Sequence, residues 1–589
     1  MGEFCLYLLL AVLSTWPLAR DLDRSVALGQ ETAASVPLFT TWTVWWNADR
    51  MAHGYRGYWD APIFHPDADT FAFSEPMPTT AIVAPLLWLS HNRLLAHNVF
   101  LLAALALNGW AGLQLLRDVG LGRWSATLGG TLIVLMPMVH RELGVLQLVP
   151  LFGILWTVRC LLRFEKRPSP LRGVWLGAAF AVTYLTCASY GLFLSVLLPL
   201  GAVWILGKRW RDARTWTTLP IAVLASLALV APVVVLQWRA AHQHGLVRSP
   251  ELVKRLSAKP EDYLISPGKR AGQPAAIGQR RAETRFLLYP GIVIVGLALL
   301  GTWGGLVRQR HRRWTAFCVT VLLAAFMLSL GPGFRLASWS PYAALMDWYP
   351  GFAQVRSPFR FAIFVQLMTV LLAACGLSVM ERAVQLVCAR GFRRGSDPLR
   401  WHRGGTILAC VCTLAVAGAA LTEILPPRPA MYTPPTFPTQ RGWIEWLQTN
   451  TLPDSIVVCL PFPQGDGVRD YEQTTLWMYW ATFHQRKLVN GYSGFLPANY
   501  VATKQQMIHF PDAASIRQLQ SHAATYCVIH RSYRTRKDLE SDLTARRYLC
   551  WCYADERAEI DIYRLRTPDA KTAQPEAFTL KPPFEKAAS

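Results

Sequence analysis

About eleven apolar stretches in this sequence are each long enough to cross a membrane, and they limit the fold more than any other feature. The stretches begin near Phe4, Leu94, Trp124, Val145, Gly173, Gly191, Thr217, Tyr289, Thr315, Phe359 and Gly405. Their length and spacing predict a mainly α-helical, polytopic membrane bundle.

Positive charge gathers in the short loops that follow every second apolar stretch. In chain order, the basic clusters are Arg117 and Arg123; Arg159, Arg163, Lys166, Arg167 and Arg172; Lys208, Arg209, Arg211 and Arg214; Arg308, Arg310, Arg312 and Arg313; and Arg382, Arg390, Arg393, Arg394, Arg400 and Arg403. Because cytoplasmic loops carry an excess of Lys and Arg, these loops and the N-terminus are predicted to be cytoplasmic. The long loops over 20–93, 239–287 and 333–357, and everything after about Pro426, are then predicted to be exported.

The composition fits a membrane bundle that is joined to a sizeable soluble part. A hydrophobic fraction of 52% and a mean hydropathy of +0.23 are modest for a bundle alone. The formal net charge of +22 does not indicate nucleic acid binding, because so many basic residues stand where the topology requires them. The Cys residues form no paired CxxC motifs, so no zinc site is indicated.

A change of composition near Pro426 divides the chain into two domains. We predict a membrane domain over 1–425 and, after a Pro-rich linker, an exported α/β domain over 426–567. Strands are expected over 455–460 and 526–530, and a closing hairpin over 548–553 and 559–564. The tail over 568–589 is predicted to be disordered.

The loop over 20–93 contains an aromatic helical pattern that begins at Pro37 and stops at Gly54. Large apolar side chains recur on one face of it, at Leu38, Phe39, Trp42, Trp45 and Trp46. The pattern predicts an interfacial amphipathic helix in the headgroup layer, either as part of a lipid entrance or as a Trp-rich anchor with no chemical role. A second apolar segment over 79–89 is too short to span and is predicted to be interfacial or re-entrant.

Motifs of soluble nucleotide enzymes are missing from the sequence. It contains no Walker loop, no GxSxG or HExxH motif and no dinucleotide fingerprint. The loop over 239–287 is strongly basic, which suits either phosphate groups or a contact with solvent and anionic lipid heads.

The architecture resembles the C-type (GT-C) integral-membrane glycosyltransferases, most of all their uncharacterised bacterial members, and distantly the dolichyl-phosphate-mannose protein mannosyltransferases. Besides the first long loop, three segments carry the resemblance: Pro260-Glu261-Asp262-Tyr263-Leu264, Arg356-Ser357-Pro358-Phe359-Arg360-Phe361 and Asn490-Gly491-Tyr492-Ser493-Gly494-Phe495. The resemblance implies an enzyme of the bacterial inner membrane that moves a hexose or pentose from a polyprenyl-phosphate donor to an acceptor on the exported face. Its implied partners are the lipid-linked sugar and membrane lipids, without nucleic acid. No cofactor is certain, and a divalent metal is left open.

In that superfamily, transfer uses an acidic residue early in the first long loop, usually an Asp. The equivalent stretch here reads Leu28-Gly29-Gln30-Glu31, so Glu31 would take that part. Glycosyl transfer to a hydroxyl needs a base, and a carboxylate beside an apolar helix is partly desolvated, which raises its basicity. Asp60 and Glu75 are competing catalytic candidates on the same loop.

Ten further residues are predicted to contact substrate, and several have a purely structural alternative. They are Trp42, Trp46, His140, Arg141, Arg356, Arg360, Asp262, Tyr263, Asn490 and Tyr492. Arg356 and Arg360 would hold a lipid phosphate or extend to headgroups. His140 and Arg141 would face the same cavity or cap a span with an ion pair. Asn490 and Tyr492 would contact a sugar or form a turn.

Two other functions remain open beside the enzyme. A lipid-linked glycan transporter or flippase is opposed by the few charges inside the spans and by the absence of an inverted repeat. A non-catalytic membrane assembly protein is kept open by the missing Asp in the first long loop.

Overall fold

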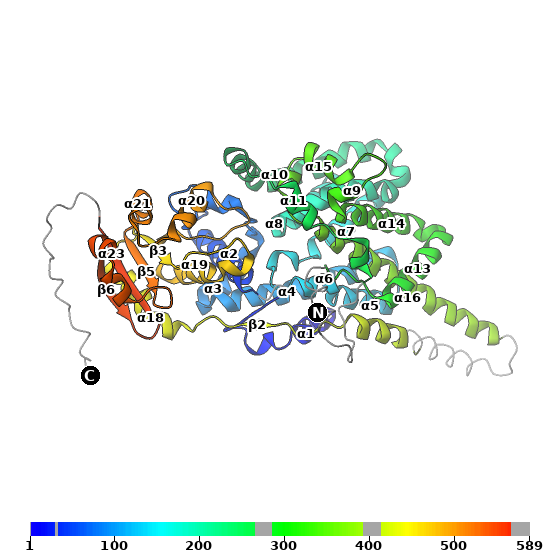
Figure 1. The fold of residues 1–589 in the computed structure, drawn as a ribbon. Coiled ribbons are helices and arrows are strands. Elements are labelled where there is room, and N and C mark those ends of the chain that lie inside the picture. Colours follow the sequence, from blue (N-terminus) through cyan, green and yellow to red (C-terminus); the bar gives the residue numbers. More distant parts are fainter. Residues whose placement is uncertain (1, 30–32, 265–285, 393–410, 412–413, 567–589) are drawn as a thin grey trace.

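The computed structural model describes residues 2–29, 33–264, 286–392, 411 and 414–566. Long helices fill one side of the molecule and a small sheet lies at the other (Figure 1). The α-helices before residue 393 are α1 (Gly2–Ser14), α2 (Ser35–Ala52), α3 (Ala84–Ser90), α4 (Arg93–Val119), α5 (Arg123–Val134), α6 (Pro137–Arg141), α7 (Phe152–Lys166), α8 (Pro170–Thr186), α9 (Ala188–Leu206), α10 (Ala213–Gln243), α11 (Pro250–Arg255), α13 (Ile292–Val307), α14 (Gln309–Ser329), α15 (Pro341–Trp348) and α16 (Ala362–Phe392).

Six of the described helical segments are long and apolar enough to cross a membrane. They are Arg93–Val119, Leu146–Lys166, Ala188–Arg211, Ala213–Gln243, Gln309–Ser329 and Pro358–Ala383. Shorter helices occupy the other predicted stretches, at Gly2–Ser14, Arg123–Val134, Pro170–Thr186, Ile292–Val307 and Leu414–Ile424. The fold is that of a polytopic membrane protein. The count of eleven crossings stays a prediction, because a span needs about 20 residues, and the last stretch, predicted from Gly405, lies largely outside the described residues.

Basic loops from different parts of the chain meet at one end of the bundle. Arg209 Nε donates to the carbonyl of Glu165 at 3.1 Å, and Arg313 forms an ion pair with the Glu165 carboxylate at 3.7 Å. The Arg310 guanidinium packs against Gly120. The clusters predicted to share one side of the membrane therefore lie together, and which side they face remains a prediction.

The helix α2 is buried on all sides, which corrects its predicted place in the headgroup layer. Trp42 and Trp45 are 0% and 6% exposed, and Thr41 and Asn47 on the opposite face are fully buried as well. The helix packs against α19 (Glu472–His484) of the C-terminal part, and also against α3 and α4. Figure 1 shows α2 between the sheet and the helical bundle. The helix α2 is therefore a buried element that connects the C-terminal part to the bundle, and it does not face lipid.

The C-terminal part folds around a five-stranded sheet of order β4-β3-β5-β7-β6. The strands are β3 (Ile456–Leu460), β4 (Lys487–Leu488), β5 (Tyr526–His530), β6 (Leu549–Asp555) and β7 (Ile560–Leu565). β3 runs parallel to both β4 and β5, and β5, β7 and β6 are antiparallel neighbours. The predicted strands and closing hairpin are present. The helices α18 (Phe437–Asn450), α20 (Ala498–Met507), α21 (Ala513–Ser521), α22 (Arg536–Ser541) and α23 (Leu543–Tyr548) complete this part. The predicted tail lies outside the described residues.

The first long loop ties the sheet to the membrane bundle. Its short strand β1 (Val26–Ala27) pairs antiparallel with β2 (Met431–Tyr432) of the linker. Farther along the loop, His65 N donates to the carbonyl of Leu488 at 2.9 Å. The helix α4 adds a contact, since Arg93 Nε donates to Thr482 Oγ1 at 3.1 Å. These contacts bring residues of the loop and of the sheet to the end of the bundle opposite the basic loops.

Candidate active site

Glu75 lies in the second half of the first long loop, in a segment held by two helices. On one side, Asn47 of α2 donates its side-chain amide to the carbonyl of Pro76 at 2.8 Å and to that of Met77 at 3.1 Å. On the other, Gln237 of α10 donates to the carbonyl of Ser74 at 2.9 Å. Because the backbone is held before and after Glu75, its carboxylate has a defined direction.

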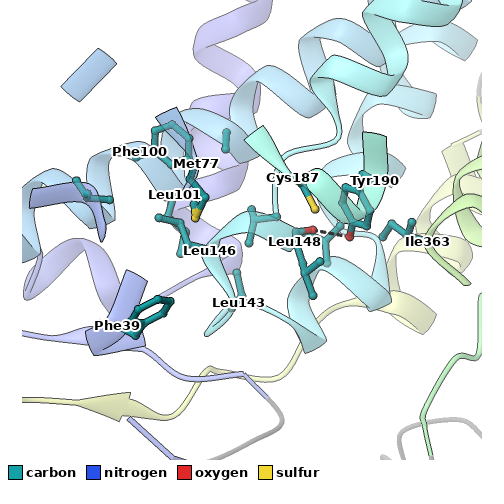
Figure 2. Packing of buried hydrophobic residues seen from close by; sticks show 14 of the residues in the cluster. Phe39, Met77, Phe100, Leu101, Leu143, Leu146, Leu148, Cys187, Tyr190 and Ile363 are labelled. Atoms are coloured by element: carbon teal, nitrogen blue, oxygen red, sulfur yellow. Dashed lines mark hydrogen bonds between the residues drawn. The ribbon is translucent and has the colours of Figure 1, made fainter. Parts of the chain in front are cut away.

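The carboxylate of Glu75 points to the start of α9. Ser189 Oγ donates to Glu75 Oε1 at 2.5 Å, and the Cys187 thiol lies beside the same carboxylate. The second oxygen, Oε2, is buried and accepts no hydrogen bond from any residue the structure describes. Figure 2 shows Met77, Cys187 and Tyr190 among buried hydrophobic residues that pack together, with the Tyr190 hydroxyl donating to the Leu148 carbonyl at 2.8 Å. One carboxylate oxygen is thus positioned and unpartnered.

Three arginines gather at the same end of the bundle. Arg248 follows α10, while Arg356 and Arg360 stand on the segment that enters α16. Burial, and then repulsion from Arg356 and Arg360, lower the pKa of Arg248 to about 10. Arg248 therefore remains charged at neutral pH, and the repulsion among these arginines favours a bound anion.

The arginines are linked to Glu75 through Cys187. This thiol lies within electrostatic reach of both the Glu75 carboxylate and the Arg360 guanidinium. Arg248 Nε and Arg360 Nε are buried, and neither donates a hydrogen bond to any described residue. Buried N–H groups of this kind are costly unless they find an acceptor, and guanidinium groups match phosphate oxygens well.

The C-terminal part closes over Arg248. The Arg248 guanidinium donates to the carbonyl of Gly494 and lies 3.4 Å from the ring centroid of Phe495. Phe495 N in turn donates to the carbonyl of Phe73 at 3.0 Å, two residues before Glu75. The sheet domain therefore supplies part of the wall beside the arginines.

Of the two other catalytic candidates from the sequence, the structure describes Asp60 but not Glu31. Asp60 is exposed, and its Oδ1 accepts a hydrogen bond from Asp69 N at 3.1 Å in a surface turn. Glu31 lies outside the described residues, although the flanking Gly29 packs on the backbone of Arg141 and Gly144. The Arg141 guanidinium lies 4.9 Å from the ring centroid of Phe359, next to Arg360. The chain on one side of Glu31 thus runs along the same end of the bundle.

Several predicted contact residues have structural partners. Trp42 is fully buried and stacks on Trp46 at 6.1 Å, so in this structure it offers no surface to a substrate. His140 is buried with Nε2 at 3.0 Å from the Val134 carbonyl, and burial lowers its pKa to about 4, so its imidazole is neutral.

The candidates from the segments over 260–264 and 490–495 also have structural partners. Asn490 exchanges two hydrogen bonds with the backbone of Cys459, at 2.6 and 2.8 Å. Asp262 caps a helical turn through Lys259 N at 2.8 Å, and Tyr263 donates to Ser329 Oγ at 2.8 Å. Tyr492 packs between Phe39 and Tyr471. Of the predicted contact residues, Arg360 is linked to the Glu75 carboxylate through Cys187, and Arg356 is linked to the same cluster through Arg248.

Several residues of this arrangement were not predicted as site residues. Arg248 was visible only as one of many charges in the basic loop, and Asn47 only as part of a polar helix face. Ser189 and Cys187 carry no sequence signal, because their role depends on the approach of a distant loop. Within the described part of the chain, no group of three or more His, Cys, Asp or Glu residues is placed to hold a metal ion.

The overall fold is similar to the C-type (GT-C) fold of membrane glycosyltransferases. The arabinofuranosyltransferase AftD from Mycobacteria shares this fold with a TM-score of 0.53 at 15% identity, over 97% of this chain and 41% of its own. This chain thus spans about two fifths of the AftD chain. Lower-scoring matches include the oligosaccharyltransferase AglB from Archaeoglobus fulgidus (TM-score 0.46, 12% identity, 96% of this chain and 74% of that one) and ArnT from Cupriavidus metallidurans (TM-score 0.44, 14% identity, 96% and 98%).

Residues 39–391 match the model of a family described as a domain of unknown function, DUF6311. The match covers more than half of the chain, and the protein belongs to this family. No curated protein matches it.

Proposed function

We propose that this protein is a membrane glycosyltransferase that moves a sugar from a polyprenyl-phosphate donor to an acceptor hydroxyl at the end of the bundle where Glu75 lies. The observation that carries the proposal is the pairing of an unpartnered buried carboxylate oxygen with a cluster of three arginines. The fold supports it, because the GT-C fold is that of membrane glycosyltransferases.

The Glu75 carboxylate and the arginine guanidinium groups suit the two halves of a glycosyl transfer. The acceptor hydroxyl must lose a proton as its oxygen bonds to the anomeric carbon, and Glu75 Oε2 is positioned to accept it. The bond from the sugar to the phosphate breaks at the same time, and the phosphate leaves with added negative charge. Arg248 and Arg360 direct buried N–H groups that can stabilise that charge.

Ser189 and the C-terminal turn complete the proposed site. Ser189 holds Oε1 and so directs the other oxygen of Glu75 to the acceptor. Gly494 and Phe495 fix the Arg248 side chain, so that less conformational entropy is lost when it binds phosphate. The exported location of this site stays a proposal that rests on the basic loops at the other end.

Comparing three carboxylate variants tests the role of Glu75. Glu75→Gln keeps the shape and the Ser189 contact but removes the proton acceptor, so turnover should fall by about 100- to 10,000-fold. Asp60→Asn is the matched control on the same loop and should stay near wild type, because Asp60 is an exposed turn residue. The assay is release of radiolabelled sugar from polyprenyl-phosphate donors by the purified protein.

Glu31→Gln decides between the two possible bases. If Glu31→Gln abolishes turnover while Glu75→Gln retains it, Glu31 is the base, as the family resemblance implies. If wild-type protein leaves the sugar on every lipid donor but carries the intact donor across a vesicle membrane, the transporter should replace the enzyme.

A further inference from the structure

A groove at the basic end of the bundle lies far from Glu75 and has a different composition. It encloses about 700 Å³ between the end of α4, the end of α7 and the start of α8. Its lining consists of Asp118, Cys160, Arg163, Lys166, Leu171, Arg172 and Trp175. It is thus basic on one side and apolar on the other.

The positive charge of the groove is only partly neutralised by the protein. The carboxylate of Asp118 is paired with two arginines, since its Oδ2 accepts from Arg159 Nε at 2.8 Å and from Arg163 Nε at 2.9 Å. Lys166 and Arg172 contact backbone carbonyls instead, and neither forms an ion pair with a carboxylate among the described residues. The groove therefore keeps a net positive charge that suits an anion.

The apolar side of the groove is open to the surroundings of the bundle. Leu171 and Trp175 lie in the first two turns of α8 and are 67% and 61% exposed. Exposed Trp side chains beside basic residues are typical of the boundary between the headgroups and the hydrocarbon of a bilayer. A ligand with a charged head and an apolar tail matches both sides.

The length of α8 separates this groove from the candidate active site. The helix has 17 residues and ends at Thr186, next to Cys187. At 1.5 Å per residue this is about 25 Å. The groove and Glu75 therefore lie near opposite ends of α8.

We propose that the groove between α7 and α8 binds the headgroup of an anionic phospholipid. The phosphate lies between Lys166 and Arg172, and an acyl chain lies along Leu171 and Trp175. This lipid belongs to the leaflet opposite the proposed sugar donor, and it acts as a structural ligand that holds the ends of α7 and α8 together.

Native mass spectrometry of the purified full-length protein, titrated with phosphatidylglycerol and with phosphatidylcholine, tests this binding. The wild type should prefer phosphatidylglycerol, and the double variant Lys166→Gln/Arg172→Gln should bind it about tenfold more weakly, because each basic residue near an anionic headgroup contributes to its attraction. The matched control is Lys208→Gln/Arg211→Gln, which removes the same charge from exposed positions in a neighbouring basic loop. It should change the affinity by less than about twofold.

A third variant and a competitor separate a lipid from a free anion. Trp175→Gln alters an exposed side chain, so it should leave folding intact and weaken lipid binding. Equal losses in the two double variants would show diffuse attraction to the basic end and would overturn the proposal. Full displacement of the lipid by millimolar inorganic phosphate, together with no effect of Trp175→Gln, would assign the groove to a free anion and would also overturn it.

Discussion

Single side chains at the Glu75 end act mainly by holding the backbone of a loop. Asn47 and Gln237 come from helices far apart in the sequence, and both donate to carbonyls that flank Glu75. Asn47 is also held by Tyr58, whose hydroxyl donates to Asn47 Oδ1 at 2.6 Å. The position of the carboxylate therefore depends on amide groups that never need to touch a substrate.

Replacing Asn47 should therefore impair turnover as well as stability. Asn47→Ala leaves the Pro76 carbonyl without its buried donor and removes one of the donors to the Met77 carbonyl, which should lower the free energy of unfolding by about 1–3 kcal/mol. It should also lower kcat more than it raises KM, because Glu75 loses its direction. The control Thr41→Ala removes a buried hydroxyl that bonds only to Pro37 of its own helix, at 2.8 Å. Thermal unfolding and sugar release measure both effects, and equal kcat values for the two variants would contradict a positioning role.

At the scale of elements, the sequence predicts short strands better than it predicts the surroundings of helices. The strands β3 and β5 follow from short apolar runs bounded by turn residues, and their observed limits are close to the predicted ones. The helix α2 was also predicted, but its environment was not. Its Thr hydroxyls donate hydrogen bonds to backbone carbonyls of the same helix. Thr43 Oγ1, for example, donates to the Phe39 carbonyl at 3.0 Å. A polar face that needs no water can pack inside the protein, and periodicity alone does not reveal this.

The burial of α2 changes the expected result of a charge in its aromatic cluster. Trp45→Glu should unfold or strongly destabilise the protein, by at least the roughly 3–5 kcal/mol typical of truncating a buried Trp. If α2 were an interfacial helix, the same substitution would only move it out of the headgroup layer. The control Met51→Glu introduces the same charge near the exposed end of the same helix, where the side chain is 42% exposed. Near-wild-type thermal stability of Trp45→Glu in detergent would contradict the internal position of α2.

At the scale of the whole molecule, the chain separates a basic end from the end that carries Glu75. This separation could be predicted in outline, because alternating basic loops must gather on one side. The candidate site could be predicted only in part. Arg356 and Arg360 could be noted beside an apolar stretch. Asn47 and Ser189, in contrast, reach the Glu75 segment, and Arg248 reaches Arg356 and Arg360, through contacts between segments that are distant in sequence.

Reporter fusions test the orientation of the two ends. A periplasm-dependent reporter fused after Ser589 should be active, and the same reporter placed after Arg211 should be inactive, because Arg211 belongs to a basic loop. Activity after Arg211 and none after Ser589 would invert the topology. The site would then face the cytoplasm, and the proposed exported acceptor would be wrong.

The central claim, that the arginines at the Glu75 end bind the phosphate of a lipid donor, is tested most directly by the affinity of the purified protein for polyprenyl monophosphate. Arg360→Gln should weaken this binding by about tenfold or more, because it removes a charged and buried donor. Arg312→Gln, an exposed arginine at the basic end, should leave it unchanged. If Arg360→Gln binds polyprenyl monophosphate as tightly as the wild type, or if Arg312→Gln loses as much affinity, the arginine cluster is not the donor site.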